Sequence, residues 1–260
     1  MIDSAELLAQ LAANLSDGDR ALSDAIEKHP DEPVAFVARA RFRYESALSL
    51  GTPGMAQAVA EATGMDYFRG ALDDYTRVIE LSEALSEEHA DAVLCECFLN
   101  IASILMRLGA LGPSCDAATL AIERVSDRAD GDPLKRRVLA QGHKARGTAR
   151  HLQGLVAEAV EDYGPALQLD PEDGETASNR GEALVTLGRF ADAVADFDRA
   201  VELGHAHPLT YCGRAMAQEG LGLPERALED YARALALDEN NEQARSGLER
   251  LRAAASGDGQ

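Results

Sequence analysis

Small, aromatic and aliphatic residues recur with a fixed period in the second half of the chain. A segment that begins at Gly188 is repeated 34 residues earlier from Gly154 and 34 residues later from Gly222. Because residues four and seven positions apart lie on one face of an α-helix, each copy is predicted to form an amphipathic helix. The positions kept in register are a small residue (Ala159, Ala193, Ala227), a ring (Tyr163, Phe197, Tyr231), a second small residue (Ala166, Ala200, Ala234) and a leucine (Leu169, Leu203, Leu237).

A second predicted helix precedes each of these helices at a constant offset. A glycine between the two helices of each pair predicts a tight turn, since glycine readily ends a helix. The upstream helices contain Arg146-Gly147-Thr148-Ala149, Arg180-Gly181-Glu182-Ala183 and Arg214-Ala215-Met216-Ala217. The pairs resemble the tetratricopeptide repeat (TPR), a family in which small residues let helix A approach helix B and a ring fills the gap. The resemblance covers residues 140–241 and implies an all-α fold, a right-handed α-solenoid of TPR helical hairpins.

The first half of the chain carries the same pattern in a divergent form, over residues 33–139. Pro33 opens a predicted helix that contains Tyr44, and its partner helix contains Tyr75. An insertion near residues 51–66 separates these two helices. A second divergent hairpin has its helix B starting at Pro113, and Asp132 before Pro133 predicts the start of the next helix.

Both ends of the chain depart from the clear repeat. A degenerate N-terminal hairpin is predicted over residues 1–32, from the apolar runs Leu7–Leu15 and Ala21–Pro30. Residues 242–255 carry an apolar stripe, which predicts a capping helix that hides the last repeat from water. The tail at residues 256–260 is predicted to be disordered. We therefore expect about six hairpins, three clear and three degenerate, followed by the capping helix.

An arginine on helix A occurs together with an aspartate on helix B in four repeats. The remaining divergent repeat has Ile101 and Ala117 at these offsets and so lacks both members. An arginine fork matches a carboxylate, and a lone buried charge is costly, so we predict a structural column of Arg–Asp bridges where the helices pack. The alternative is a ladder of arginines that faces an acidic ligand. The pairs are Arg39 with Asp74, Arg146 with Asp162, Arg180 with Asp196, and Arg214 with Asp230.

Composition narrows the classes of ligand. Hydrophobic residues make up 46% of the chain but aromatics only 5%, which favours close-packed helices. The formal net charge is −20, and an acidic surface repels phosphate backbones, so we expect no nucleic-acid ligand. No apolar run approaches the length that crosses a bilayer, so we expect no membrane insertion.

The cysteines and the N-terminal residues predict a cytoplasmic protein. Cys95, Cys97, Cys115 and Cys212 fall in predicted helices at uneven spacing, which favours reduced thiols over a disulfide framework. The first residues lack the basic and apolar regions of a signal peptide.

The sequence lacks the motifs that carry catalysis or hold a cofactor. It has no Walker-type loop and no His-Glu-x-x-His, and Gly220-Leu221-Gly222 is predicted to be a helix turn. Cys95 and Cys97 would point apart by about 200° on one helix, which disfavours a shared metal. We therefore expect no enzymatic activity, no catalytic residue, no metal and no cofactor.

The TPR resemblance implies a groove that binds another protein. In this family helix A builds most of the concave wall, and mixed polar and apolar side chains there suit an extended peptide or a helix. Carried over by position, the wall comprises Arg41, Tyr44, Asn100, Met106, Arg107, Lys144, Thr148, His151, Asn179, Glu182 and Met216.

Some TPR domains clamp the C-terminal carboxylate of a chaperone with basic and asparagine side chains. Lys144 and Asn179 match two of the clamp positions. Thr148 replaces an asparagine, while Leu209 and Gly213 replace basic residues, so the clamp is incomplete. We therefore predict an adaptor or co-chaperone-like module that binds its partner by other contacts. The alternative is a self-associating structural scaffold, with the 51–66 insertion or the C-terminal helix as the contact.

Overall fold

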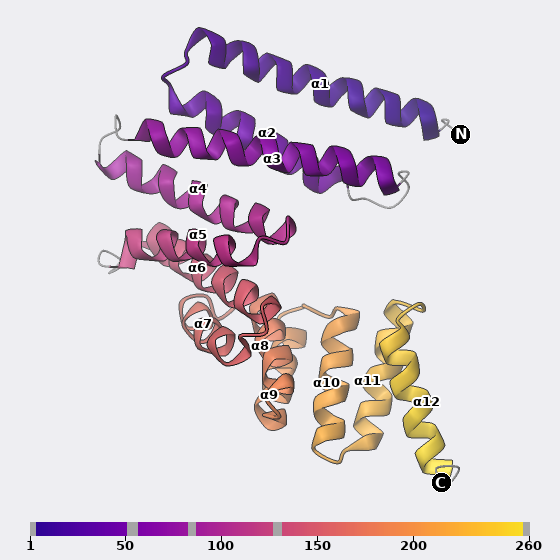
Figure 1. Cartoon of the computed structure of the whole chain (residues 1–260). Helices are drawn as coiled ribbons and strands as arrows, with labels where there is room; N and C mark the ends of the chain where they lie inside the picture. The colour runs from indigo at the N-terminus through magenta and orange to yellow at the C-terminus, as the bar shows by residue number, and fades with distance from the viewer. Residues whose placement is uncertain (1–3, 51–56, 83–86, 127–131, 257–260) are drawn as a thin grey trace. The chain divides into compact units, whose positions relative to one another are not determined.

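The regular elements of the chain are α-helices, which confirms the all-α fold class. The computed structural model describes residues 4–50, 57–82, 87–126 and 132–256, and these residues contain twelve α-helices (Figure 1). The helices are α1 (Ser4–Lys28), α2 (Pro33–Leu50), α3 (Gln57–Leu81), α4 (Glu87–Arg107), α5 (Leu111–Ser126), α6 (Pro133–Leu152), α7 (Val156–Leu169), α8 (Gly174–Thr186), α9 (Phe190–Glu202), α10 (Pro208–Gly220), α11 (Pro224–Leu237) and α12 (Glu242–Ser256).

The helices form two compact units, which we describe separately. Unit 1 is Met1–Asp127 and contains α1 to α5, with the hairpins α2/α3 and α4/α5. Unit 2 is Arg128–Gln260 and contains α6 to α12, with the hairpins α6/α7, α8/α9 and α10/α11. Within each unit every hairpin also contacts the next helix in sequence, as stacked TPR hairpins do.

Buried rings set the distance between the helices of unit 2. The Phe197 ring on α9 is fully buried, and it lies against Gly181 of its own helix A and Gly213 of the following one. A Cβ atom added at Gly213 would lie 2.4 Å from Phe197 Cζ, and one added at Gly181 would lie 3.0 Å from the ring. Tyr231 lies equally close to Gly247 of α12. The small residues of the repeat are therefore the space that the rings occupy.

Glycines end the A helices of unit 2, as the spacing predicted. Gly154, Gly188 and Gly222 have φ values of 80°, 71° and 72°, in the left-handed region that glycine adopts without strain. The turn after α6 shows the accompanying bonds, because Gly154 N donates to His151 O and Leu155 N donates to Arg150 O. The predicted start of α6 is also confirmed, since the Asp132 side chain accepts from the backbone N–H of Leu134 at 2.9 Å.

The hairpin expected at residues 1–32 is wrong, because α1 is one helix of 25 residues. The polar stretch near Gly18 reads as a turn by sequence, but Gly18 lies inside the helix. A Cβ atom there would lie 2.5 Å from Phe42 Cζ of α2, so this glycine admits a neighbouring ring and does not end a helix. Tertiary contact outweighs the weak helix propensity of such residues. The described residues thus contain five hairpins, with α1 before them and α12 after them.

The insertion near residues 51–66 lies in part within α3. That helix begins at Gln57, so the insertion lengthens helix B of the first hairpin, while residues 51–56 lie outside the described part of the chain. At the other end of the chain, Ala244 and Leu248 of α12 are buried against Tyr231 and Ala234 of α11. The helix therefore covers the apolar side of the last hairpin. The predicted disordered tail falls outside the described residues, except for Ser256, which ends α12.

The ring–glycine contact predicts a difference between two glycine-to-alanine changes. Gly213→Ala places a methyl group against the fully buried Phe197 ring, whereas at Gly64, inside α3, the nearest atom is 3.7 Å away, an ordinary contact. Both changes gain the same helix propensity, so their difference isolates the clash. We expect Gly213→Ala to have a free energy of unfolding about 1–3 kcal/mol below that of Gly64→Ala, measured by urea denaturation with circular dichroism. Equal stabilities of the two variants would mean that the ring is not packed as described.

Candidate functional site

The A helices of unit 2 contact one another and carry six of the predicted groove residues. Helix α8 contacts both α6 and α10, so side chains on these three helices form a continuous surface. We call this surface the helix-A face of unit 2. It comprises Lys144, Thr148, His151, Asn179, Glu182 and Met216.

Lys144 is held by carboxylates of the protein itself. Its Nζ lies 3.0 Å from Asp173 Oδ2 and 2.5 Å from Glu175 Oε2. Burial alone would lower the pKa of Lys144, but the hydrogen bonds to Glu175 and Asp173 raise it above its ordinary value. The amine is therefore a cation that is already neutralised. It does not offer the unpaired charge that a carboxylate clamp needs, in keeping with the absence of basic residues at positions 209 and 213.

The remaining residues of the face differ in how they are bonded. Thr148 Oγ1 donates to the backbone carbonyl of Lys144 at 2.9 Å and accepts from the Tyr163 hydroxyl at 3.3 Å. Met216 is 37% exposed, and its sulfur accepts from the Gln243 amide at 2.9 Å. The face therefore combines satisfied polar groups with an accessible apolar side chain.

His151 and Glu182 are half-buried titratable groups on this face. Burial lowers the pKa of the His151 imidazole and raises the pKa of the Glu182 carboxyl. Among the described residues, Glu182 has no cation within ion-pair distance, and only burial shifts its pKa. Glu219 of α10 is different, because its carboxylate contacts Arg250 of α12 at 2.7 Å and accepts from the Tyr231 hydroxyl at 2.6 Å.

The predicted groove residues of unit 1 bind to neighbouring helices of that unit. Arg41 pairs with Glu96 through both of its donors, and the Tyr44 hydroxyl lies 2.7 Å from Ser103 Oγ. These contacts join α2 to α4. The other three residues lie on α4: Asn100 donates to the Tyr75 hydroxyl at 3.0 Å, the Arg107 guanidinium lies 5.9 Å from the centre of the Phe68 ring, and Met106 is half-buried.

The structure brings each arginine of the Arg–Asp column to its aspartate within one hairpin. The four arginine side chains are 10–29% exposed and the aspartates 1–10%, so none of these arginines lies in open solvent. In the hairpin that lacks the column, Arg124 Nε bonds Asp91 at 2.6 Å instead. The shortest contacts are 2.6 Å for Arg39–Asp74, Arg146–Asp162 and Arg180–Asp196, and 2.7 Å for Arg214–Asp230.

A second donor for each aspartate was missed by sequence reasoning. It lies four residues after the column arginine, on the same face of helix A. Arg43 donates to Asp74 at 3.0 Å, Arg150 to Asp162 at 2.7 Å and Gln218 to Asp230 at 3.0 Å. The spacing of four was the available signal.

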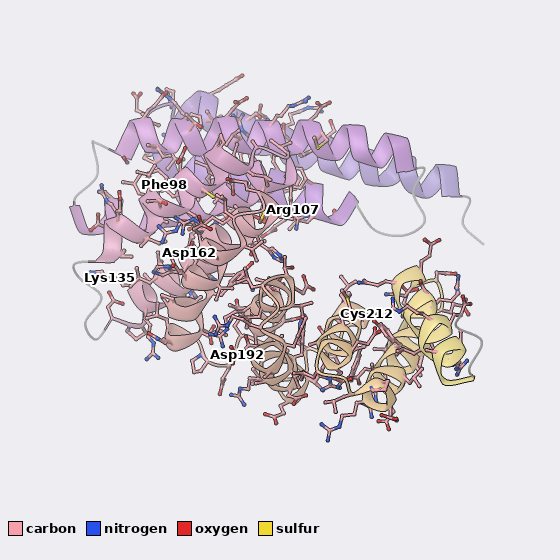
Figure 2. The ribbon with its side chains drawn as sticks, turned by 60° about the horizontal axis from the view of Figure 1, so that its bottom comes forward. Phe98, Arg107, Lys135, Asp162, Asp192 and Cys212 are labelled. Atoms are coloured by element: carbon pink, nitrogen blue, oxygen red, sulfur yellow. The ribbon has the colours of Figure 1, made fainter. Side chains whose placement is uncertain are left out.

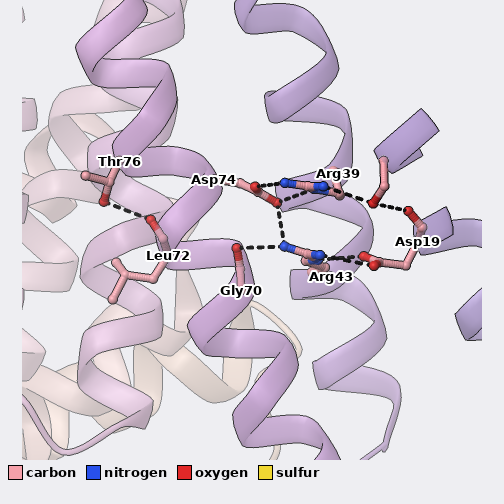
Figure 3. Close-up of polar contacts among 8 residues, drawn as sticks. Asp19, Arg39, Arg43, Gly70, Leu72, Asp74 and Thr76 are labelled. Atoms are coloured by element: carbon pink, nitrogen blue, oxygen red, sulfur yellow. Dashed lines mark hydrogen bonds and ion pairs between the residues drawn. The ribbon is translucent and has the colours of Figure 1, made fainter. Parts of the chain in front are cut away.

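In unit 1 this second donor links three helices (Figure 3). Arg39 and Arg43 of α2 both bind Asp74 of α3, and Arg43 also binds Asp19 of α1 through two of its nitrogens. Arg43 further donates to the backbone carbonyl of Gly70 at 3.2 Å. The charge cluster therefore fixes α1 onto the first hairpin.

The second repeat of unit 2 has Leu184 where the other column repeats have a second donor. A shallow cavity of about 260 Å³ lies there, and its charged groups are Arg180 with Asp196 and Arg189 with Asp192, each already paired. Small-molecule sites are usually larger, about 300–1,000 Å³, and present unpaired polar groups. The cavity is therefore a gap in the packing and not a ligand site with a clear chemistry.

The described residues hold no cluster suited to a metal or a nucleophile. No group of three or more His, Cys, Asp or Glu side chains gathers within the described ranges. The four cysteines lie in those ranges and form no disulfide with one another, and burial raises the pKa of the Cys97 thiol to about 12. That thiol stays protonated at neutral pH and is a poor nucleophile. None of the described helices is both long and apolar enough to cross a membrane.

The comparisons with known proteins agree with the repeat pattern. A tetratricopeptide repeat model matches residues 209–241. The structure of YrrB, described as a TPR protein with an unusual peptide-binding site, is 15% identical, with a TM-score of 0.56 over 87% of this chain and 96% of that chain. MamA is 16% identical, with a TM-score of 0.53 over 72% of this chain and 96% of that chain. At these identities both likenesses show the fold.

A third similar structure covers less of the chain at a higher identity. It is the first TPR of Spaghetti (RPAP3) bound to the HSP90 peptide SRMEEVD, at 31% identity over 46% of this chain and 95% of that chain, with a TM-score of 0.45. No curated protein sequence matches the chain.

The buried column predicts a large loss of stability on removing one carboxylate. Asp230 is 1% exposed and accepts from Arg214, Gln218 and Arg233, so Asp230→Ala leaves buried donors without their acceptor. We expect the free energy of unfolding to fall by about 3–5 kcal/mol. Asp192→Ala, which breaks an exposed pair with Arg189, should change it by about 0–1 kcal/mol. Denaturant unfolding of the two variants measures both, and a small loss for Asp230→Ala would contradict the structural role of the column.

The Asp162 carboxyl predicts a pH-dependent part of the stability (Figure 2). Burial alone would raise the pKa of Asp162, but hydrogen bonds from His143 and Arg146 and the charge of Arg150 hold it below its ordinary value. A carboxyl with a lowered pKa in the folded state stabilises the fold fully above its unfolded-state pKa, about 3.9, and this contribution is lost as pH falls through the folded-state pKa. The stability difference between the parent and Asp162→Asn should therefore be large near neutral pH and shrink below pH about 4. A difference that stays constant down to pH 2 would contradict this assignment.

Proposed function

The chain belongs to the tetratricopeptide-repeat family, and we propose that it is a non-catalytic interaction module that binds a segment of another protein. The proposed site is the helix-A face of unit 2, and the occupant is an extended peptide or a helix. We also propose that the protein acts as an adaptor or co-chaperone-like factor in the cytoplasm, where its thiols stay reduced.

The observation that carries this proposal is the direct contact between successive A helices. Because α8 contacts both α6 and α10, their exposed side chains form one surface rather than isolated patches. A surface that spans three helices is long enough for a peptide to contact several side chains in turn, as recognition of extended or helical segments requires. The accessible Met216 supplies an apolar anchor beside the polar Asn179 and Glu182.

Site-specific crosslinking tests whether the partner binds on this face. A photoreactive benzoylphenylalanine replaces Met216 on α10 in one variant and the exposed Ala232 on α11, a B helix, in a matched control. Both variants are illuminated in native cell extract, and the adducts are identified by mass spectrometry. We expect adducts with another protein from position 216 and not from position 232.

The other outcomes separate the rival functions. Adducts from position 232 alone would move the site to the B helices. Adducts of the chain with itself would support the self-associating scaffold. The absence of protein adducts from both positions would overturn the proposed binding function.

A further inference from the structure

A spacing of 31 residues joins a side chain on one A helix of unit 2 to its neighbour on the next. Lys144 of α6 contacts Glu175 of α8 across this spacing. Glu219 of α10 contacts Arg250 of α12 across the same spacing. The two contacts show that face residues 31 apart lie beside each other along the stack, because the repeat period is 34 and the helix positions differ by three.

The Glu219–Arg250 contact shows how this scaffold satisfies a carboxylate on the face. The guanidinium comes from the next helix, and the Tyr231 hydroxyl donates to the same carboxylate. Glu219 is 21% exposed at its side chain, so its charge is partly removed from water and benefits from a cation.

The step from α6 to α8 has the carboxylate without the cation. The register places His151 and Glu182 as the pair that corresponds to Glu219 and Arg250, since they too are 31 residues apart. Burial lowers the pKa of His151, which keeps the imidazole neutral at neutral pH. Glu182 is also half-buried and has no cation within ion-pair distance among the described residues.

The step from α8 to α10 is apolar. The residues at the spacing of 31 are Val185 and Met216, and Met216 is exposed. Along the face there is thus a carboxylate that lacks a cation, followed by an apolar anchor. Neighbouring packed helices lie about 8–10 Å apart, and an extended chain advances about 3.3 Å per residue, so the two features are spaced for residues about three apart.

We propose that the helix-A face of unit 2 binds a basic segment of a partner protein, whose arginine or lysine pairs with Glu182 as Arg250 pairs with Glu219. An apolar side chain about three residues away contacts Met216. This assignment rests on the proposed function of the same face and adds the chemistry of the ligand. The net charge of −20 favours it, because an acidic protein attracts a basic segment and repels an acidic tail.

The test uses the full chain and labelled twelve-residue peptides in fluorescence anisotropy. The peptides contain Arg-x-x-Leu or Leu-x-x-Arg within Ser and Ala, to allow for either chain direction. In matched peptides citrulline, the neutral isostere, or glutamate replaces the arginine. We expect the arginine peptide to bind at least about tenfold more tightly than the citrulline peptide, as for a hydrogen-bonded charge pair.

Two variants separate a specific pair from general attraction. Glu182→Gln removes the carboxylate from the face, and Glu202→Gln removes the same charge from the exposed end of α9. Circular dichroism confirms that both are folded. We expect the preference for arginine over citrulline to fall to about twofold or less in Glu182→Gln and to persist in Glu202→Gln.

Three results would overturn the inference. They are an equal effect of the two variants, tighter binding of the glutamate peptide, and no binding of the arginine peptides. Crosslinking from position 216 then decides separately on the proposed function: a partner segment that lacks Lys and Arg would retain the binding face and reject its proposed ligand.

Discussion

The buried aspartate of helix B is the group on which each hairpin depends. A carboxylate that is almost fully removed from water is costly unless it is paired and hydrogen-bonded, and Asp230 and Asp162 each accept from at least three side chains. The arginine fork from helix A supplies two of these bonds at once and fixes the two helices in direction and register. The ring that follows the aspartate then packs against glycine, as Phe197 does, and sets how closely the helices approach.

This use of arginine shapes the surface that remains. The chain has 25 basic side chains against 45 acidic ones, and the column places several of the basic ones between helices. On the helix-A face of unit 2, Lys144 is bound by Asp173 and Glu175. The cations that could receive an acidic ligand are therefore used within the fold, while Glu182 keeps its carboxylate without one among the described residues. Electrostatic complementarity follows from the internal pairing and not from the net charge alone.

The sequence predicted the parts of the fold that repeat and missed those that occur once. The period of 34 located the rings, the turn glycines and the column, because each has a local cause that recurs in every hairpin. Gly18 has no such context, since its role depends on Phe42 of another helix, and the single helix α1 was interpreted as a hairpin. For the same reason position 144 could be placed on helix A by register, but its bonds to Asp173 and Glu175 depend on side-chain conformations that a period does not encode.

The two spacings in unit 2 separate folding from recognition. Residues 34 apart, such as the rings, are equivalent positions of the core, and a change in one of them alters packing. Pairs 31 apart lie on the helix-A face, and they are a cation with an anion at Lys144–Glu175, an anion with a cation at Glu219–Arg250, and apolar at Val185–Met216. Since the face varies from step to step while the core does not, its pairs are free to specify a ligand without altering the hairpins. His151 and Glu182 form the one of these four pairs in which a charge remains unanswered within the described structure, and that is the position where a partner gains most by supplying it.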